Sequence, residues 1–253
     1  MLETQLTKEA AWFRWLEDQD EEDVMFMLEN DPSLVSLRDD DGRTGLHWSC
    51  SLNHKSIIKK LLSYPDTERN ARDLSGWTAL HCASAAGSDE AVRLLLEDGD
   101  VDANACSDAG TTPLHHACSR NRDGIVQRLL AAGANVNAID NYGRTPLLLC
   151  AGGHCAEVMR LLVDRDDLNF KEQQKGSQYS ALHAAAEAQQ EANIVLLASA
   201  CPDLLFMKNS EGKTPLDLMT EKHFYLIKSK VKAGTIPKPA EGSNDFDGRN
   251  VDT

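Results

Sequence analysis

Histidines and cysteines are the residues of this chain whose side chains could perform chemistry. Four histidines each follow a threonine or serine by three residues, namely His47, His81, His115 and His183. Further His and Cys side chains lie close together in residues 115–118 and 150–155. Imidazole nitrogen and thiolate sulfur are ligands that zinc prefers, and histidine is the commonest general base. A zinc site or an acid–base centre is therefore the first chemistry to consider.

These histidines recur with the period of a sequence repeat, which favours a structural role. The Thr-x-Leu-His segments and their variants begin at Thr44, Thr78, Thr112, Thr145, Ser180 and Thr214, with spacings of 34, 34, 33, 35 and 34 residues. We expect histidines at such periodic positions to hydrogen-bond turn backbone, because buried polar groups need partners. Cys50 and Cys118 occupy the position of Ser84 and Ala186 in other units, which indicates packing. With no nucleophile elbow or phosphate-binding loop either, we predict no catalytic residue, no metal and no cofactor.

Each of the six hydroxyl residues predicts the start of a helix. Its side-chain oxygen can accept from an early helical N–H, and a following proline such as Pro113 loses no hydrogen bond there. A second apolar stripe follows in most units, for example over residues 125–130, so each repeat contains two helices. A glycine two residues before the threonine, such as Gly42, and Asp39 three residues earlier still are typical of a β-turn.

A β-turn finger followed by an antiparallel helix pair, every 33 to 35 residues, resembles the ankyrin repeat over about residues 39–232. Tetratricopeptide repeats share the period, but their tryptophan, glycine-tyrosine and proline signature is absent. The resemblance predicts an all-α ankyrin-repeat solenoid of about seven repeats, counting the N-terminal and C-terminal caps, with β-turn fingers.

The repeat pattern divides the chain into three parts. Residues 1–38 lack the motif and carry two short apolar patterns, so we predict an N-terminal capping repeat with an acidic extension. Residues 39–232 contain the ankyrin repeats and end in a C-terminal cap. Residues 233–253 are polar and rich in Pro and Gly, and we predict that they are disordered.

Composition limits the partners and the compartment. The formal net charge of −14 makes nucleic acid an unexpected partner. No basic N-terminal region and no apolar stretch of about 18 to 20 residues is present, so we expect neither a signal peptide nor a membrane segment. Seven scattered cysteines favour a reducing compartment. We therefore expect a cytoplasmic and nuclear monomer that does not bind membranes.

A partner-binding face is predicted from positions that stacking does not need. The fourth, seventh and eighth residues after each threonine should face the concave groove, and they are Trp48, Ser51, Leu52, Cys82, Ala85, Ala86, His116, Ser119, Arg120, Leu149, Gly152 and Gly153. Small residues admit a partner closely, and Trp and Arg are enriched in binding hot spots. An acidic fingertip invites a basic partner. The predicted partner-binding residues are Asp39, Asp41, Arg43, Trp48, Asp73, Trp77, Arg120, Tyr142 and Arg144.

Each of these residue types also has an ordinary structural explanation. Trp48 and Trp77 could simply pack between neighbouring fingers. Arg43 and Arg120 could form local salt bridges. The residues alone leave both alternatives open.

Three stretches are more specific than the generic repeat, namely residues 39–51, 73–81 and 119–122. Together with the total of seven units they resemble the gankyrin family of proteasome assembly chaperones. The resemblance implies that the concave face binds the C-terminal domain of one AAA-ATPase subunit of the regulatory-particle base. It assigns Asp41 as an acid that meets basic residues of the ATPase, and Arg43 and Arg120 as the two bases that meet acidic ones.

The sixth unit departs from that family. Residues 182–187 lack the cysteine of the Leu-x-Cys-x-Glu motif found in animal members, Gln178 replaces the turn glycine, and Leu148 replaces the histidine of the fifth unit. We predict a non-catalytic chaperone that binds an ATPase domain and blocks its premature contact with the proteolytic core. The alternative is a generic ankyrin adaptor or kinase inhibitor that uses the same groove. An enzyme would need an active site on the finger loops.

Overall fold

The computed structural model describes residues 8–18 and 21–238, and it divides into two compact units, Met1–Asn135 and Val136–Thr253. The described residues contain fourteen α-helices and two short 3₁₀ helices, with no β-strand, so the prediction of an all-α fold is confirmed. No described helix is long and apolar enough to span a membrane. The predicted features of residues 1–7, 19–20 and 239–253 lie outside the described residues.

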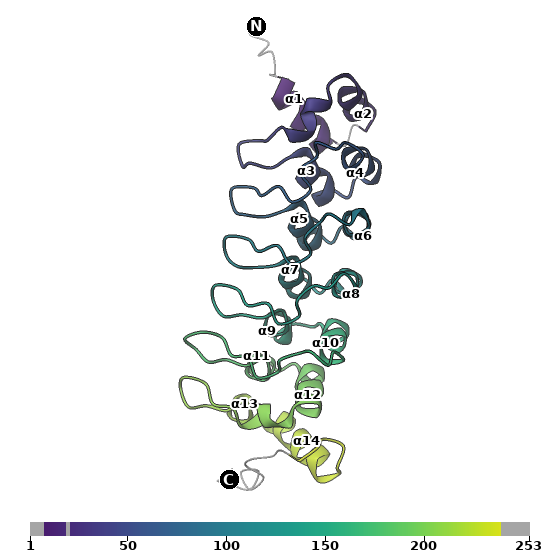
Figure 1. Ribbon diagram of the computed structural model, residues 1–253. Helices are drawn as coiled ribbons and strands as arrows, with labels where there is room; N and C mark the ends of the chain where they lie inside the picture. The colour runs from purple at the N-terminus through teal and green to yellow at the C-terminus, as the bar shows by residue number, and fades with distance from the viewer. Residues whose placement is uncertain (1–7, 19–20, 239–253) are drawn as a thin grey trace. The chain divides into compact units, whose positions relative to one another are not determined.

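The first unit consists of helix pairs separated by finger loops (Figure 1). Its elements are α1 (Lys8–Asp18), α2 (Glu21–Asn30), η1 (Pro32–Ser36), α3 (Gly45–Ser51), α4 (Lys55–Leu62), α5 (Ala79–Ala86), α6 (Asp89–Asp98), α7 (Pro113–Ser119) and α8 (Asp123–Ala131). The inner helices α3, α5 and α7 each follow a finger, and the outer helices α4, α6 and α8 lie on the side of the inner helices away from the fingers (Figure 1). This is the arrangement that the periodic Gly-x-Thr segments predicted.

The second unit repeats the same plan. Its elements are α9 (Pro146–Ala151), α10 (Ala156–Val163), α11 (Ala181–Glu187), α12 (Glu191–Ala200), η2 (Pro202–Phe206), α13 (Pro215–Leu218) and α14 (Glu221–Lys232). Fingers precede α9, α11 and α13, and α12 packs against both α10 and α14. With four helix pairs in the first unit and three here, the expected number of about seven repeats agrees with the described residues.

The periodic histidines join each helix start to the next finger. The Thr44 N–H donates to His47 Nδ1 at 3.1 Å, and His47 Nε2 donates to the carbonyl of Trp77 at 3.0 Å. His81 repeats this pattern with the carbonyl of Thr111, as does His183 in the second unit. Burial lowers the pKa of His81 to about 4, so this imidazole is neutral at pH 7. The predicted bond to turn backbone is confirmed.

Two sequence departures are accommodated locally. Where Leu148 replaces histidine, the Thr145 hydroxyl accepts from the Leu148 N–H at 3.2 Å and still caps α9. In the sixth finger Gln178 adopts the left-handed φ of 53° that glycine would favour. That finger closes through the Gln178 N–H and the Gln174 carbonyl at 2.9 Å, a turn one residue longer than the others. The unit therefore keeps its finger.

The N-terminal cap covers the first inner helix with a tryptophan. Trp12 is fully buried, and a Cβ placed on Gly45 would lie 2.7 Å from its Cζ2 atom. Other units carry Ala79 or Pro113 at the position of Gly45. Glycine is therefore required where the cap, rather than a repeat, packs on the helix.

The prediction of disorder from residue 233 onward is wrong for its first residues. Gly234 reverses the chain with a φ of 74°, and the Ile236 N–H donates to the Lys230 carbonyl at 3.2 Å. Ile236 is 0% exposed, because one apolar side chain folds back under α14. The ordered chain therefore extends beyond α14 at least to Lys238.

Candidate protein-binding site

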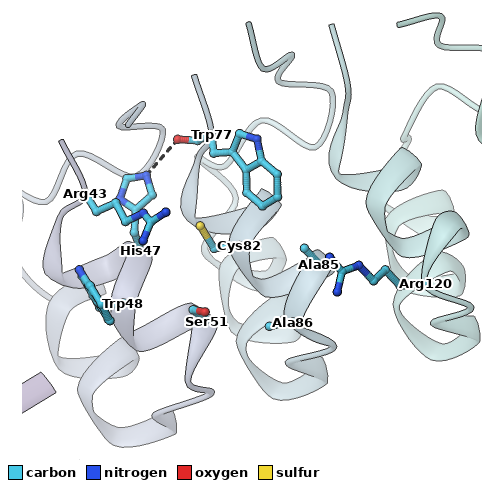
Figure 2. Close-up of a pocket in the computed structure, with 9 residues that line it drawn as sticks. All are labelled: Arg43, His47, Trp48, Ser51, Trp77, Cys82, Ala85, Ala86 and Arg120. Carbon is cyan, nitrogen blue, oxygen red and sulfur yellow. Dashed lines mark hydrogen bonds between the residues drawn. The ribbon is translucent and has the colours of Figure 1, made fainter. Parts of the chain in front are cut away.

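A pocket of about 270 Å³ opens on the finger side of the first unit, among the inner helices α3 and α5 and the end of α7 (Figure 2). Its lining consists of Arg43, His47, Trp48, Ser51, Trp77, Cys82, Ala85, Ala86 and Arg120. These side chains come from three successive repeats at the positions expected to face a groove, and from the junctions between fingers and helices. The name pocket face is used below for these nine residues.

The floor of the pocket is small and neutral. Ser51, Ala85 and Ala86 leave the helix surfaces low enough for a partner side chain to approach (Figure 2). Burial raises the pKa of Cys82 to about 12, so its thiol stays protonated at neutral pH. Charge at the pocket therefore comes from its edges.

The fingers are held by two aspartates that act within the chain. Asp39 accepts hydrogen bonds from the N–H groups of Asp41 and Arg43, and its second oxygen accepts from Trp48 Nε1 at 2.8 Å. Asp73 accepts from the backbone of its own finger in the same way and its side chain is only 5% exposed. Partner contact was predicted for both carboxylates, and each of them also stabilises its own finger through these turn bonds.

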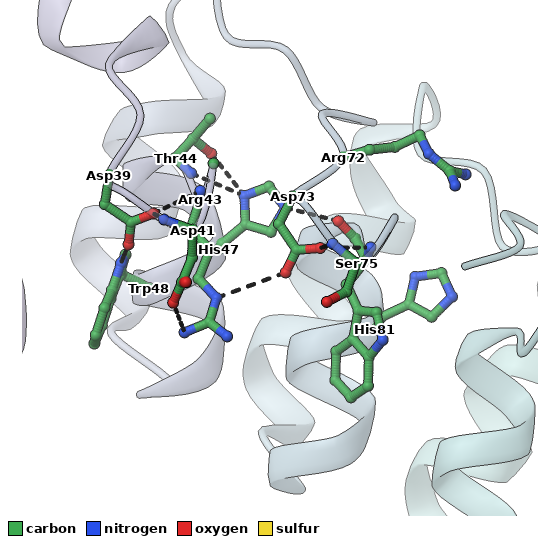
Figure 3. A network of polar contacts seen from close by, with 12 residues as sticks. Asp39, Asp41, Arg43, Thr44, His47, Trp48, Arg72, Asp73, Ser75 and His81 are labelled. Carbon is green, nitrogen blue, oxygen red and sulfur yellow. Dashed lines mark hydrogen bonds and ion pairs between the residues drawn. The ribbon is translucent and has the colours of Figure 1, made fainter. Parts of the chain in front are cut away.

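Arg43 is held above the pocket between two fingers (Figure 3). Its guanidinium lies 3.7 Å from an Asp41 carboxylate oxygen and 3.6 Å from Asp73 Oδ2, and 5.9 Å above the Trp48 ring. Both ion-pair distances exceed those of hydrogen bonds. The side chain as a whole is 40% exposed, but its Nε is buried and has no hydrogen-bond partner among the described residues, so only the rest of the guanidinium is open to a partner.

Trp48 and Trp77 serve the fingers and the pocket together. Trp48 is hydrogen-bonded to Asp39, and the Trp77 ring lies 4.3 Å from the His116 ring, centre to centre. Both are half-buried and both line the pocket. The packing alternative and the partner-contact alternative are therefore compatible, because each indole presents one surface inward and another to the pocket.

Arg120 completes the pocket from the next repeat. It follows α7 as the C-cap residue and its side chain is exposed. It forms no ion pair with the residues that the structure describes. Arg43 and Arg120 therefore place two cations beside the same apolar hollow, and neither is neutralised at hydrogen-bonding distance.

Tyr142 and Arg144 belong to the second unit and do not line this pocket. Arg144 Nε donates to Asp140 Oδ2 at 2.7 Å, and its guanidinium lies 4.8 Å from the centre of the Tyr142 ring. The Asp140 side chain is 0% exposed, so Arg144 neutralises a buried carboxylate of its own finger. Arg144 is therefore engaged in a salt bridge within its own finger.

Sequence reasoning did not select His47 as a pocket residue. His47 lines the pocket because the bond from Nε2 to the Trp77 carbonyl holds the imidazole beside the second finger. Burial lowers its pKa, so it contributes a neutral surface. Its periodic position predicted a bond to turn backbone, but nothing in the sequence indicated that the ring edge also meets the pocket.

The arrangement is chemically suited to binding a protein surface. Within residues 8–18 and 21–238, no group of three or more His, Cys, Asp or Glu side chains is placed to hold a metal ion. The pocket has two cationic edges, two indoles and a floor of small side chains. Such a combination matches an acidic residue flanked by apolar ones on a partner protein.

Comparison with known proteins supports the repeat assignment. A family model described as ankyrin repeats (3 copies) matches residues 15–105 and 99–172, more than half of the chain. No curated protein is significantly similar in sequence. The prediction of an ankyrin-repeat fold is therefore confirmed.

Proposed function

Because the chain belongs to the ankyrin-repeat family, whose repeats are protein-binding modules, we propose that its pocket face holds a protein domain during assembly of a larger complex. The proposed partner is the C-terminal domain of one AAA-ATPase subunit of the proteasome regulatory-particle base, as the resemblance to the gankyrin family implies. In this proposal the protein is a non-catalytic assembly chaperone of the cytoplasm and nucleus.

One observation carries the proposal. Arg43 and Arg120, the two bases that the resemblance assigns, line one pocket although 77 positions separate them in the chain, from 43 to 120. Trp48 and Trp77 lie beside them. Aromatic and Arg side chains around a desolvated centre are the usual composition of a hot spot, with polar residues such as the exposed Asp41 at its rim.

Occlusion is the proposed mechanism. Carboxylates of the ATPase domain would pair with Arg43 and Arg120, while a basic group would approach Asp41, whose side chain is 69% exposed. The backbone hydrogen bonds between successive fingers, such as Leu74 N–H to the Asp41 carbonyl at 2.8 Å, hold this surface rigid before binding. A preorganised face loses little conformational entropy when the partner binds. The bound domain is then shielded from other subunits.

The test is binding of the isolated ATPase C-terminal domain to the full chain. A double variant with Arg43→Glu and Arg120→Glu should bind about 100-fold more weakly, because each change places like charges across the interface. A matched control carries Lys59→Glu and Arg128→Glu on the outer helices α4 and α8, with the same change in net charge, and should bind as the unmodified chain does. Unchanged affinity of the first variant would remove the proposed site.

The alternative function is an adaptor or kinase inhibitor that uses the same pocket. The departures of the fifth and sixth units from the gankyrin family, at Leu148, Gln178 and residues 182–187, favour it. Affinity capture from cells distinguishes the two. Co-purification of regulatory-particle base subunits supports the chaperone, whereas capture of a protein kinase without those subunits supports the alternative.

A further inference from the structure

A second hollow, of about 670 Å³, lies on the outer helices of the second unit. We name it the outer groove. Its walls include Val195 and Leu196 of α12 and Leu226 of α14, with Arg160, Glu191 and Lys230 among them. The outer groove and the pocket face share no residue, so it is independent of the proposed function.

The apolar surface of α12 departs from the pattern of the other outer helices. Two residues before the buried leucine of each outer helix, the chain carries Lys59, Arg93, Gln127 and Arg160 in successive repeats, but Val195 in α12. Ile194 and Leu197 are buried on the inner side of α12, while Val195 and Leu196 remain half-exposed. A helix that is apolar on both sides is normally covered on both.

The charged side chains around the outer groove leave a cationic edge. Glu191 is neutralised by Lys222 at 2.7 Å, and Arg160 pairs with Glu157 on the same exposed turn. Lys230 has no ion-pair partner among the described residues. An acidic segment with one large apolar side chain would complement this surface.

The chain itself contains such a segment directly after α14. Residues 239–253 hold four carboxylates against one arginine, and Phe246 is their only aromatic residue, between Asp245 and Asp247. The Ile236 N–H donates to the carbonyl of Lys230, a residue of the groove wall, so Ile236 and the start of the segment that follows it lie close to the groove. The ten residue-to-residue steps from Ile236 to Phe246 can span up to about 33 Å, more than the roughly 10 Å between packed helices.

We propose that residues 239–253 fold back onto the outer groove as an intramolecular ligand. Phe246 inserts between Val195, Leu196 and Leu226, and Asp245 and Asp247 face the cationic edge. A short tether keeps the effective concentration of this segment at about the millimolar level, so a weak contact is enough to cover the surface. The docked segment hides an apolar patch that would otherwise favour association with other chains.

Photo-cross-linking of the full chain tests this proposal. Phe246 is replaced by p-benzoylphenylalanine, and adducts are mapped by mass spectrometry. The expected adducts join residue 246 to peptides of α12 or α14. The cross-linked protein should have the mass of one chain, and the yield of cross-linking should not depend on protein concentration. As a control, the same replacement at Phe26, which is 66% exposed in the first unit, should give no adduct with those peptides.

Variants of the groove keep the test specific. Val195→Lys introduces a residue type that α4 carries at the equivalent position, so folding is retained, and it should lower the adduct yield about tenfold because apolar contact is lost. Val195→Ile should leave the yield unchanged. Adducts at the mass of two chains would assign the groove to a second copy and overturn the proposal. Adducts outside α12 and α14, or a full yield in Val195→Lys, would overturn it equally.

Discussion

The two units carry their surface hollows on different parts of the repeat. In the first unit it lies on the fingers and inner helices, around Arg43 and Arg120. In the second unit it lies on the outer helices, around Val195 and Leu196. In both units inner helices pack on inner helices and outer helices pack on outer helices, so the two surfaces are distinguished by residues outside this shared plan. Function in such a fold is therefore located by departures from the repeat, not by the repeat itself.

A pair of equivalent arginines shows the same contrast in detail. Arg43 and Arg144 each stand one residue before the capping threonine of their unit. Arg144 makes a 2.7 Å hydrogen bond to a fully buried carboxylate in its own finger, whereas the nearest carboxylate oxygens of Arg43 are 3.6 and 3.7 Å away. One side chain is committed to stability, and the other remains available to a partner.

The largest expected effect concerns the N-terminal cap, which belongs to the first unit. Trp12→Ala should lower the free energy of unfolding by about 3 to 5 kcal/mol, because a fully buried indole leaves a cavity over Gly45. Hydrogen exchange read by mass spectrometry should show the loss mainly in peptides of the first unit, since repeats interact chiefly with their neighbours. Phe26→Ala, at an exposed position, is the control and should change little. Equal loss in both units would show that the units do not unfold separately.

The second prediction compares alanine variants of the two arginines, Arg43 and Arg144. Arg43→Ala should weaken binding of the ATPase domain by about 2 to 3 kcal/mol with little effect on stability. Arg144→Ala should leave binding unchanged and destabilise the fold by about 1 to 3 kcal/mol, because the buried Asp140 loses its charged partner. Titration calorimetry and urea unfolding of both variants measure the two quantities. The comparison fails if the two variants behave alike.

Acid should weaken the first unit in particular. His81 has a pKa of about 4 when folded and an ordinary value of 6.5 when unfolded, so the unfolded chain binds the proton more tightly. Stability is therefore present above pH 6.5 and is lost as the pH falls toward 4. Lowering the pH from 7 to 5 should reduce the free energy of unfolding by about 2 kcal/mol through His81 alone. Urea unfolding of His81→Gln should show a correspondingly smaller slope with pH.

The smallest expected effect comes from a substitution that gives the fifth repeat, in the second unit, the histidine that the repeats of the first unit carry. Leu148→His restores a ring nitrogen that can accept from the Thr145 N–H, and should stabilise the second unit by about 1 kcal/mol or less. Thermal unfolding at pH 7.5 measures the gain, and it should shrink at pH 5 as the new imidazole takes up a proton. A destabilised variant would show that the fifth finger has adapted to leucine.

Much of the fold could be predicted because its signals are local. A threonine that caps a helix, a histidine three residues later and a glycine with positive φ act within one unit, so their periodic recurrence was sufficient to place the helices. The positions expected to face a groove included six of the nine residues of the pocket face. Ile236 was missed because a single apolar residue in a polar stretch has no period.

The sequence by itself determined the repeat, the caps and the candidate pocket positions, because each depends on contacts within one unit or with a like neighbour. Only the tertiary structure decided which charged side chains are available. Asp73 lies 30 positions after Arg43 in the chain. Its carboxylate accepts a hydrogen bond from the backbone of the second finger and also lies near the Arg43 side chain of the first finger. Which charged side chains are used within the chain and which remain available depends on the distances between stacked fingers. The order of residues along the chain does not give these distances.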